Sequence, residues 1–178
     1  MKIGFTGTMS VGKTTLVKRL QSLSEFKNHQ FENYKFATER SAYLSSLGIP
    51  LNYETTIEGQ TIFLAERVTE LMQESLITDR TIIDVMSFTN CATKVSYIDA
   101  DAFNEYASRF IKEYDFIFYI SPEGLGIEDN GIRETNVEYR NKIDETIQKL
   151  LFKYRPIFHT IKGSTEERIE QILKTINY

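Results

Sequence analysis

A glycine-bounded segment near the start of the chain specifies both a local shape and a chemistry. Residues 7–15 read GTMSVGKTT, which fits the phosphate-binding pattern G-x-x-x-x-G-K-[ST] without a mismatch. Glycines at both ends let the backbone curl, so that successive N–H groups point inward as an anion-binding nest. Lys13 can reach the terminal phosphates of a nucleotide, and the Thr14 hydroxyl can ligate the Mg²⁺ that accompanies them.

The residues on either side of this loop favour the same interpretation. Ile3–Thr6 is a short apolar run suited to a buried strand, and residues 14–20 carry apolar side chains at helical spacing. Strand, loop and helix therefore occur in the order that the motif requires. We expect every residue of the loop to contact a nucleoside triphosphate, namely Gly7, Thr8, Met9, Ser10, Val11, Gly12, Lys13, Thr14 and Thr15.

Composition limits the class of protein. The chain has 178 residues, 41% hydrophobic and 26% charged, which predicts one globular domain over residues 1–178. A net charge of −4 provides no global field for nucleic acid or an anionic membrane, and no apolar stretch approaches the length of a membrane span. Cys91 is the only cysteine, so we expect a cytoplasmic protein without a disulfide. His29 and His159 are too few for a zinc site.

Apolar runs alternate with helical patterns along the chain. The runs are Ile3–Thr6, Tyr34–Thr38, Ser75–Asp79, Phe116–Ser121 and Pro156–Ile161. The helical patterns cover Ile57–Glu74, Asp101–Glu113, Asn136–Tyr154 and a last helix that begins at Ser164. This alternation predicts an α/β fold, in which a five-stranded parallel sheet has helices on both faces. Ligands of such sheets bind beyond the carboxyl ends of the strands, so functional residues should follow the strand ends.

Two carboxylates follow the third apolar run. Asp79 and Arg80 come at its end, where Asp79 could polarise an acceptor hydroxyl or hold a magnesium-bound water. If Thr81 begins a helix, Asp84 falls on the first turn near the same cleft and could bind the acceptor. Alternatively, residues 81–84 form the strand and Asp84 is its terminal acid. A solvated turn with a surface ion pair would explain the same residues without a function.

A second pair, Glu39 and Arg40, follows the second run. Glu39 could act as a base or bind the acceptor, and Arg40 could hold an anionic group. A charge pair that caps a helix from Ser41 explains them nearly as well. On the helical face after Thr55 and Thr56, Gln60 could read the edge of a base through paired hydrogen bonds, or could be a boundary residue.

A third cluster lies in a polar, glycine-containing segment. Residues 128–133 read EDNGIR, and the Asn-Gly pair is typical of a turn. Arg133 could swing over the γ-phosphate when the site closes, together with Arg140 seven residues later. We therefore expect a lid over about residues 122–140, although an exposed loop with two solvated arginines would have the same sequence.

With these residues identified, the chain resembles the small-molecule kinases of the phosphate-loop class. It is similar to ribosylnicotinamide-kinase-like AAA-type ATPases, and more loosely to thymidylate and deoxynucleoside kinases. The resemblance rests on residues 7–15, ATERSAY at 37–43, EGQ at 58–60, TDRTIID at 78–84 and EDNGIRETNVEYR at 128–140. It departs from the family at residues 79–82, which read DRTI rather than DRSP, and residues 90–110 match no named acceptor site.

The resemblance implies a lid after the fourth strand and transfer of the γ-phosphate of ATP to a nucleoside or nucleotide. Lys13 and Thr14 would hold ATP and Mg²⁺, and Asp79 would be a base or lie beside the metal. Arg133 and Arg140 would be arginines of the lid. Together with Arg80, which follows the third apolar run, they could neutralise the moving charge. The sequence also leaves open a kinase that acts on DNA, a regulatory ATPase switch with a protein partner, and a homodimer.

Overall fold

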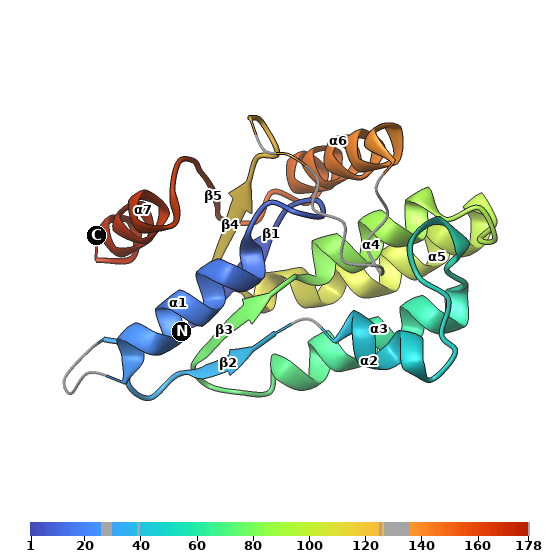
Figure 1. Ribbon diagram of the computed structural model, residues 1–178. Helices are drawn as coiled ribbons and strands as arrows, with labels where there is room; N and C mark the ends of the chain where they lie inside the picture. The colour runs from blue at the N-terminus through green and yellow to red at the C-terminus, as the bar shows by residue number, and fades with distance from the viewer. Residues whose placement is uncertain (26–29, 39, 125, 127–135, 178) are drawn as a thin grey trace.

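The computed structural model describes residues 1–25, 30–38, 40–124, 126 and 136–177 (Figure 1). Its centre is a parallel sheet with the strand order β2-β3-β1-β4-β5. The strands are β1 (Lys2–Thr6), β2 (Lys35–Ala37), β3 (Leu76–Asp79), β4 (Phe116–Ile120) and β5 (Phe158–Ile161). Each strand lies at an expected apolar run, which confirms the predicted α/β sheet.

Helices cover both faces of the sheet. The helices are α1 (Lys13–Ser24), α2 (Ser41–Ser46), α3 (Ile57–Glu70), α4 (Ile82–Cys91), α5 (Tyr97–Ala107), α6 (Val137–Tyr154) and α7 (Thr165–Ile176). Two short 3₁₀ helices lie at Asn52–Glu54 and Ser108–Glu113. None of the helices in the described ranges is long and apolar enough to cross a membrane.

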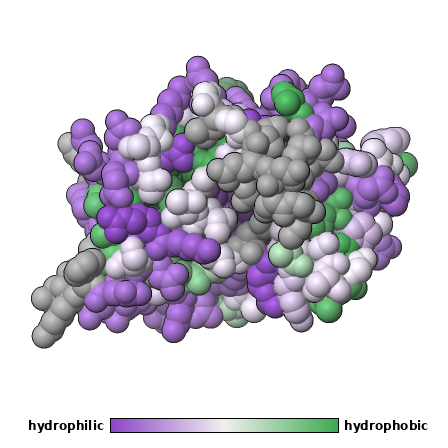
Figure 2. All heavy atoms as spheres, in the orientation of Figure 1, coloured by the Kyte–Doolittle hydropathy of each residue, from purple (hydrophilic) through white to green (hydrophobic). Residues whose placement is uncertain are grey.

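The strands divide the core into two hydrophobic clusters because successive side chains point to opposite faces. In β4, Ile117 packs in the cluster that contains residues of α3, α4, α5 and α6. Its neighbour Phe118 packs in the cluster beneath α1 and α7. The fold is therefore a three-layer arrangement with α1 and α7 on one face of the sheet. Figure 2 shows that hydrophilic residues dominate much of the molecular surface seen from this side.

The segment after β3 decides between the two structures that the sequence leaves open for residues 81–84. Thr81 accepts a hydrogen bond from the Ile83 amide, and Asp84 accepts from the Thr81 amide and hydroxyl, which makes a capping box for α4. These side-chain bonds satisfy amides that a helix start leaves without partners. The alternative that residues 81–84 form the strand is therefore wrong, and Thr81 caps a helix.

Other helix boundaries also differ. α3 ends at Glu70, four residues before the expected end. α5 begins at Tyr97 because the Ser96 side chain caps it, and the expected continuation to Glu113 is a 3₁₀ helix. Residues 128–133 of the expected lid lie outside the described residues.

Candidate active site

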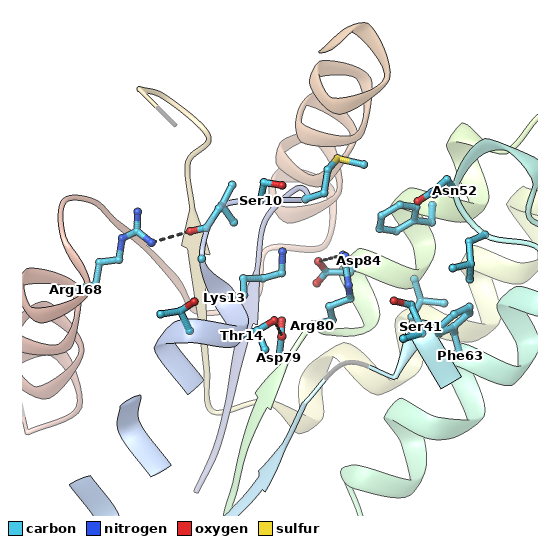
Figure 3. Close-up of a pocket in the computed structure, with 18 of the residues that line it drawn as sticks. Ser10, Lys13, Thr14, Ser41, Asn52, Phe63, Asp79, Arg80, Asp84 and Arg168 are labelled. Atoms are coloured by element: carbon cyan, nitrogen blue, oxygen red, sulfur yellow. Dashed lines mark hydrogen bonds and ion pairs between the residues drawn. The ribbon is translucent and has the colours of Figure 1, made fainter. Parts of the chain in front are cut away.

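A cleft of about 540 Å³ lies beyond the carboxyl ends of β1 and β3 (Figure 3). The loop of residues 7–15, which we call the phosphate loop, contributes residues 9–15 to its middle, together with Asp79 and Arg80. Gly7 and Thr8 do not line the cleft. One end is bounded by the turn between β5 and α7, and the other by residues of α2, α3 and α4. The cleft therefore joins the loop to Asp79 and Arg80, the pair that the sequence singles out at the end of the third apolar run.

The phosphate loop is held in shape by its glycines and its apolar side chains. Gly7 and Gly12 have φ values of +148° and +84°, which side chains rarely adopt. A Cβ on Gly7 would also lie 2.6 Å from the Ile120 carbonyl oxygen. Met9 is buried in the cluster on one face of the sheet and Val11 in the cluster on the other. The loop backbone is therefore anchored on both sides of β1.

Lys13, at the start of α1, lies against the loop and is only 5% exposed. Its ammonium group donates hydrogen bonds to the carbonyl oxygens of Gly7 at 2.6 Å and Thr8 at 2.7 Å. These bonds hold a buried cation at the first half of the loop. A phosphate in the cleft would meet both this charge and the N-terminus of α1.

The next residue connects the loop to β3. The Thr14 hydroxyl donates a hydrogen bond to Oδ2 of Asp79, which is itself buried. Oδ1 of Asp79 has no hydrogen-bond partner among the described residues. A hydroxyl and a carboxylate oxygen are the ligands that Mg²⁺ prefers, and this metal is usually held through one or two carboxylates and the phosphates of its substrate. The donor set therefore fits Mg²⁺ that arrives with a nucleotide.

The turn after Asp79 is braced by residues that sequence reasoning missed. Arg80 has a φ of +82°, which is unfavourable for a residue with a side chain. The buried Arg67 of α3 donates to the Asp79 carbonyl oxygen at 2.9 Å and pairs with Glu70 at 2.6 Å. Thr78 in turn donates to Glu70 at 2.8 Å. Burial raises the pKa of Glu70, and the nearby Arg67 guanidinium opposes that rise.

Arg80 points along the wall of the cleft. Its Nη1 lies 3.4 Å from Oδ1 of Asp84, and its guanidinium lies 4.9 Å from the ring centre of Phe88. Asp84 lines the cleft as predicted, but its carboxylate is bound by the helix cap and by Arg80. The structure therefore gives Asp84 a positioning task in addition to its place in the cleft wall.

The end of the cleft away from α7 combines aromatic and amide side chains. Phe63 and Phe88 line it together with Leu51, Asn52 and Gln60. Gln60 is buried and donates through Nε2 to the Thr55 hydroxyl at 2.9 Å. Gln60 therefore lies where the sequence places it, held by the threonine that precedes its helix.

Two of the arginines that the sequence predicts at the site, Arg40 and Arg140, do not line the cleft. Arg40 is 54% exposed, pairs with Glu66 at 3.3 Å and stacks on Tyr43, at the start of α2. α2 begins at Ser41, as the helix-start alternative expects, but the Arg40 side chain makes no capping hydrogen bond and pairs with Glu66 of α3. Arg140 is buried in α6, and its carbonyl oxygen accepts a hydrogen bond from the Thr8 hydroxyl at 3.2 Å. Burial lowers the pKa of Arg140, and nearby Asp144 opposes this. Glu39 and Arg133 lie outside the described residues.

A further arginine enters the site from the end of the chain. Arg168 of α7 lines the cleft, and its Nη1 donates to the Val11 carbonyl oxygen at 2.7 Å (Figure 3). It was not predicted because it lies 157 residues from its partner in the sequence. The residues next to Arg168 in the sequence indicate only the start of a capped helix and give no sign of a binding site.

Comparison with known proteins identifies the family. A family model described as AAA domain matches residues 2–168. The chain belongs to this AAA domain family. Comparison with curated proteins gives no match.

Solved structures show how widely this AAA domain fold is shared. Deoxyadenosine kinase from M. mycoides with bound dCTP superposes with a TM-score of 0.67 at 18% identity, covering 99% of each chain. Thymidylate kinase from Ehrlichia chaffeensis gives 0.66 at 18% identity, covering 99% of this chain and 98% of that one. NadR in complex with NAD and AMP-PNP gives 0.69 at 16% identity, covering 99% of this chain and 48% of that one. The fold expected from the phosphate-loop kinases is therefore confirmed.

Proposed function

We propose that this protein is a phosphotransferase that moves the γ-phosphate of ATP to a nucleoside or nucleotide, with Mg²⁺ as the metal. The observation that carries the proposal is the placement of Lys13, Thr14 and Asp79 in one cleft with an aromatic pocket. Lys13, Thr14 and Asp79 suit a metal-bound polyphosphate, and the aromatic pocket suits a planar organic acceptor. The fold shared with deoxyadenosine kinase, thymidylate kinase and NadR supports the same activity.

The donor half of the reaction follows from the phosphate loop. Loop amides and the Lys13 ammonium would hold the β- and γ-phosphates, because they supply positive potential at a site that is partly shielded from water. Thr14 and Asp79 would hold Mg²⁺, which supplies charge neutralisation at the phosphate oxygens when it is bound. The hydrogen bond between these two residues keeps both oxygen ligands in one place.

The acceptor half follows from the other end of the cleft. Phe63 and Phe88 line the space that a planar base would occupy, and the Gln60 amide can both donate and accept hydrogen bonds. Asp79 or Glu39 would accept the proton of the attacking hydroxyl. Asp79 ends β3 and lines the cleft, and Glu39 follows the second apolar run of the sequence. Asp84 holds Arg80 beside this pocket at 3.4 Å.

Charge that develops during transfer requires further cations. Arg80 lies beside the route between the phosphate loop and the aromatic pocket. We assign Arg133 to a lid that supplies a second source of positive charge and excludes water, whereas Arg140, the second expected lid arginine, is buried in α6 and does not line the cleft. The hydrogen bond from the Thr8 hydroxyl to the Arg140 carbonyl oxygen links the loop to the helix that follows the lid segment.

A panel of nucleosides and nucleoside monophosphates tests this function. Each compound is incubated with the protein, ATP and Mg²⁺, and ADP release and the phosphorylated product are measured. The proposal requires at least one acceptor that stimulates ADP release and gains a phosphate. ATP hydrolysis that no acceptor stimulates would instead support a regulatory switch. Transfer to duplex or single-stranded DNA alone would support a DNA kinase.

A further inference from the structure

Arg168 is a buried cation that the proposed catalytic machinery does not use. It is 6% exposed and reaches the cleft from the first turns of α7. Its Nη1 donates to the Val11 carbonyl oxygen at 2.7 Å. Its Nε is buried and has no hydrogen-bond partner within the described residues. One carbonyl therefore accepts from a guanidinium that has five N–H groups to satisfy.

The acids nearest to Arg168 in the sequence are engaged elsewhere. Glu167 accepts hydrogen bonds from the Ser164 amide at 2.7 Å and hydroxyl at 2.8 Å, where it completes the capping box of α7. Glu166 pairs with Arg19 of α1 at 2.8 Å. Across the described part of the chain, no carboxylate lies within ion-pair distance of Arg168. A buried charge without a counter-charge is strongly unfavourable, and the nearby N-terminus of α7 adds to the penalty for a cation.

The phosphate loop approaches Arg168 at its second half. A Cβ on Gly12 would lie 3.2 Å from Nη1 of Arg168, so glycine allows the guanidinium to lie against the loop. Lys13 donates to Gly7 and Thr8, which lie in the first half. The loop thus has a buried cation at each half, one from α1 and one from α7. Burial also lowers the pKa of Arg168, in agreement with the lack of an anionic neighbour.

We propose that the counter-ion of Arg168 is the inner phosphate of the bound nucleoside triphosphate, so that the last helix of the fold contributes directly to nucleotide binding. This inference rests on the proposed function for the identity of the donor. Lys13 of the motif reaches the terminal phosphates, which leaves the α-phosphate for a cation at the other half of the loop. Gly163, Ser164 and Thr165 line the same end of the cleft, so the nucleotide would extend toward α7.

The test compares Arg168→Met with Arg19→Met. The first variant replaces the buried cation with an apolar side chain of similar length. The second is a matched control, because Arg19 links α1 to α7 through the exposed pair with Glu166 and does not line the cleft. Dissociation constants for a non-hydrolysable ATP analogue, ADP, AMP and adenosine are measured by calorimetry with Mg²⁺. Melting temperatures are measured with and without each ligand.

The expected result is a selective loss of phosphate binding. Arg168→Met should raise the dissociation constants of the ATP analogue, ADP and AMP by about 10- to 100-fold, the range of a charge-assisted hydrogen bond. The dissociation constant of adenosine should be unchanged. The melting temperature without ligand should be unchanged or higher, because an uncompensated buried charge is removed. Arg19→Met should bind all four ligands as the wild type does.

Three results would overturn the inference. Unchanged affinities in Arg168→Met would remove Arg168 from nucleotide binding. A lower melting temperature without ligand, together with equal weakening for adenosine and ATP, would show a purely structural role. A wild-type protein that binds none of the ligands would remove this inference and the proposed function together. Nucleotide binding without phosphotransfer to any acceptor would instead remove only the proposed function.

Discussion

The Thr14 hydroxyl donates a hydrogen bond to the Asp79 carboxylate, which joins the first turn of α1 to the end of β3. These residues are 65 positions apart in the chain, and the pairing of β1 with β3 brings them together. The contact places a hydroxyl and a carboxylate beside the phosphate loop. It is the basis for assigning a metal to this point of the cleft.

Asp79→Asn tests that assignment. The amide keeps the size of the side chain but removes the negative charge that would hold Mg²⁺, so we expect the Mg²⁺ concentration for half-maximal activity to rise. We also expect kcat to fall by about 100-fold or more, the effect of losing a preorganised electrostatic contact. A magnesium titration of the steady-state rate measures both. Near-normal turnover with an unchanged magnesium dependence would remove Asp79 from the metal and base roles.

Lys13→Ala should abolish phosphotransfer. The variant loses the buried ammonium group beside Gly7 and Thr8, so charge on the terminal phosphates is no longer neutralised. Release of ADP in the presence of an active acceptor is the measurement. Lys18→Ala on the exposed face of α1 is the control and should retain full activity. Activity in Lys13→Ala equal to that of the control would contradict the role of the loop.

Gln60→Leu should change acceptor binding and leave the donor unaffected. The leucine has a similar size but cannot hydrogen-bond to a base, so the KM for the acceptor should rise about 10- to 100-fold. The KM for ATP should stay within about twofold, because Gln60 lies at the acceptor end of the cleft. Initial rates with each substrate varied in turn separate the two constants. Equal rises in both would indicate general disruption of the fold.

Arg133→Ala should lower kcat more than it weakens ATP binding. An arginine that reaches the γ-phosphate only when the site closes stabilises charge in the transition state, and so contributes little to ground-state affinity. Single-turnover experiments measure the rate of phosphotransfer, and calorimetry measures the affinity for ATP. Arg155→Ala, a substitution after the end of α6, is the control. A normal kcat in Arg133→Ala would show that the lid assignment is wrong.

Thr81→Ala should destabilise the protein without altering nucleotide affinity. The buried hydroxyl accepts from the Ile83 amide and donates to Asp84, so its loss removes an N-cap worth about 0.5–2 kcal/mol. Urea unfolding followed by circular dichroism measures the free energy of unfolding. A change below about 0.3 kcal/mol would mean that α4 begins without this cap.

Features that depend on neighbours in the sequence were predictable. The phosphate loop is a contiguous motif, and the strands are contiguous apolar runs, because buried parallel strands have apolar side chains on both faces. The start of α4 was ambiguous because β-branched Thr81, Ile82 and Ile83 also suit a strand. The capping hydrogen bonds of Thr81 and Asp84 show that a helix, not a strand, begins here, after β3 ends at Asp79.

Contacts between distant segments were not predictable. In the sequence, nothing distinguishes Arg67 from the other charged residues of an amphipathic helix. In the structure it is 3% exposed and donates a hydrogen bond to the Asp79 carbonyl oxygen. Arg40 follows a strand end, but its long side chain turns away to Glu66. A rule based on strand ends identifies where the backbone of a residue lies. It gives no information on the direction of a flexible side chain.

The opposed anchoring of Met9 and Val11 has a kinetic consequence. Side chains on either flank of Ser10 are immobilised in separate clusters, so the intervening backbone has few alternative conformations to lose when a ligand arrives. Capture of a nucleotide then requires little reorganisation of the protein, and its association rate should be governed by diffusion and electrostatic attraction.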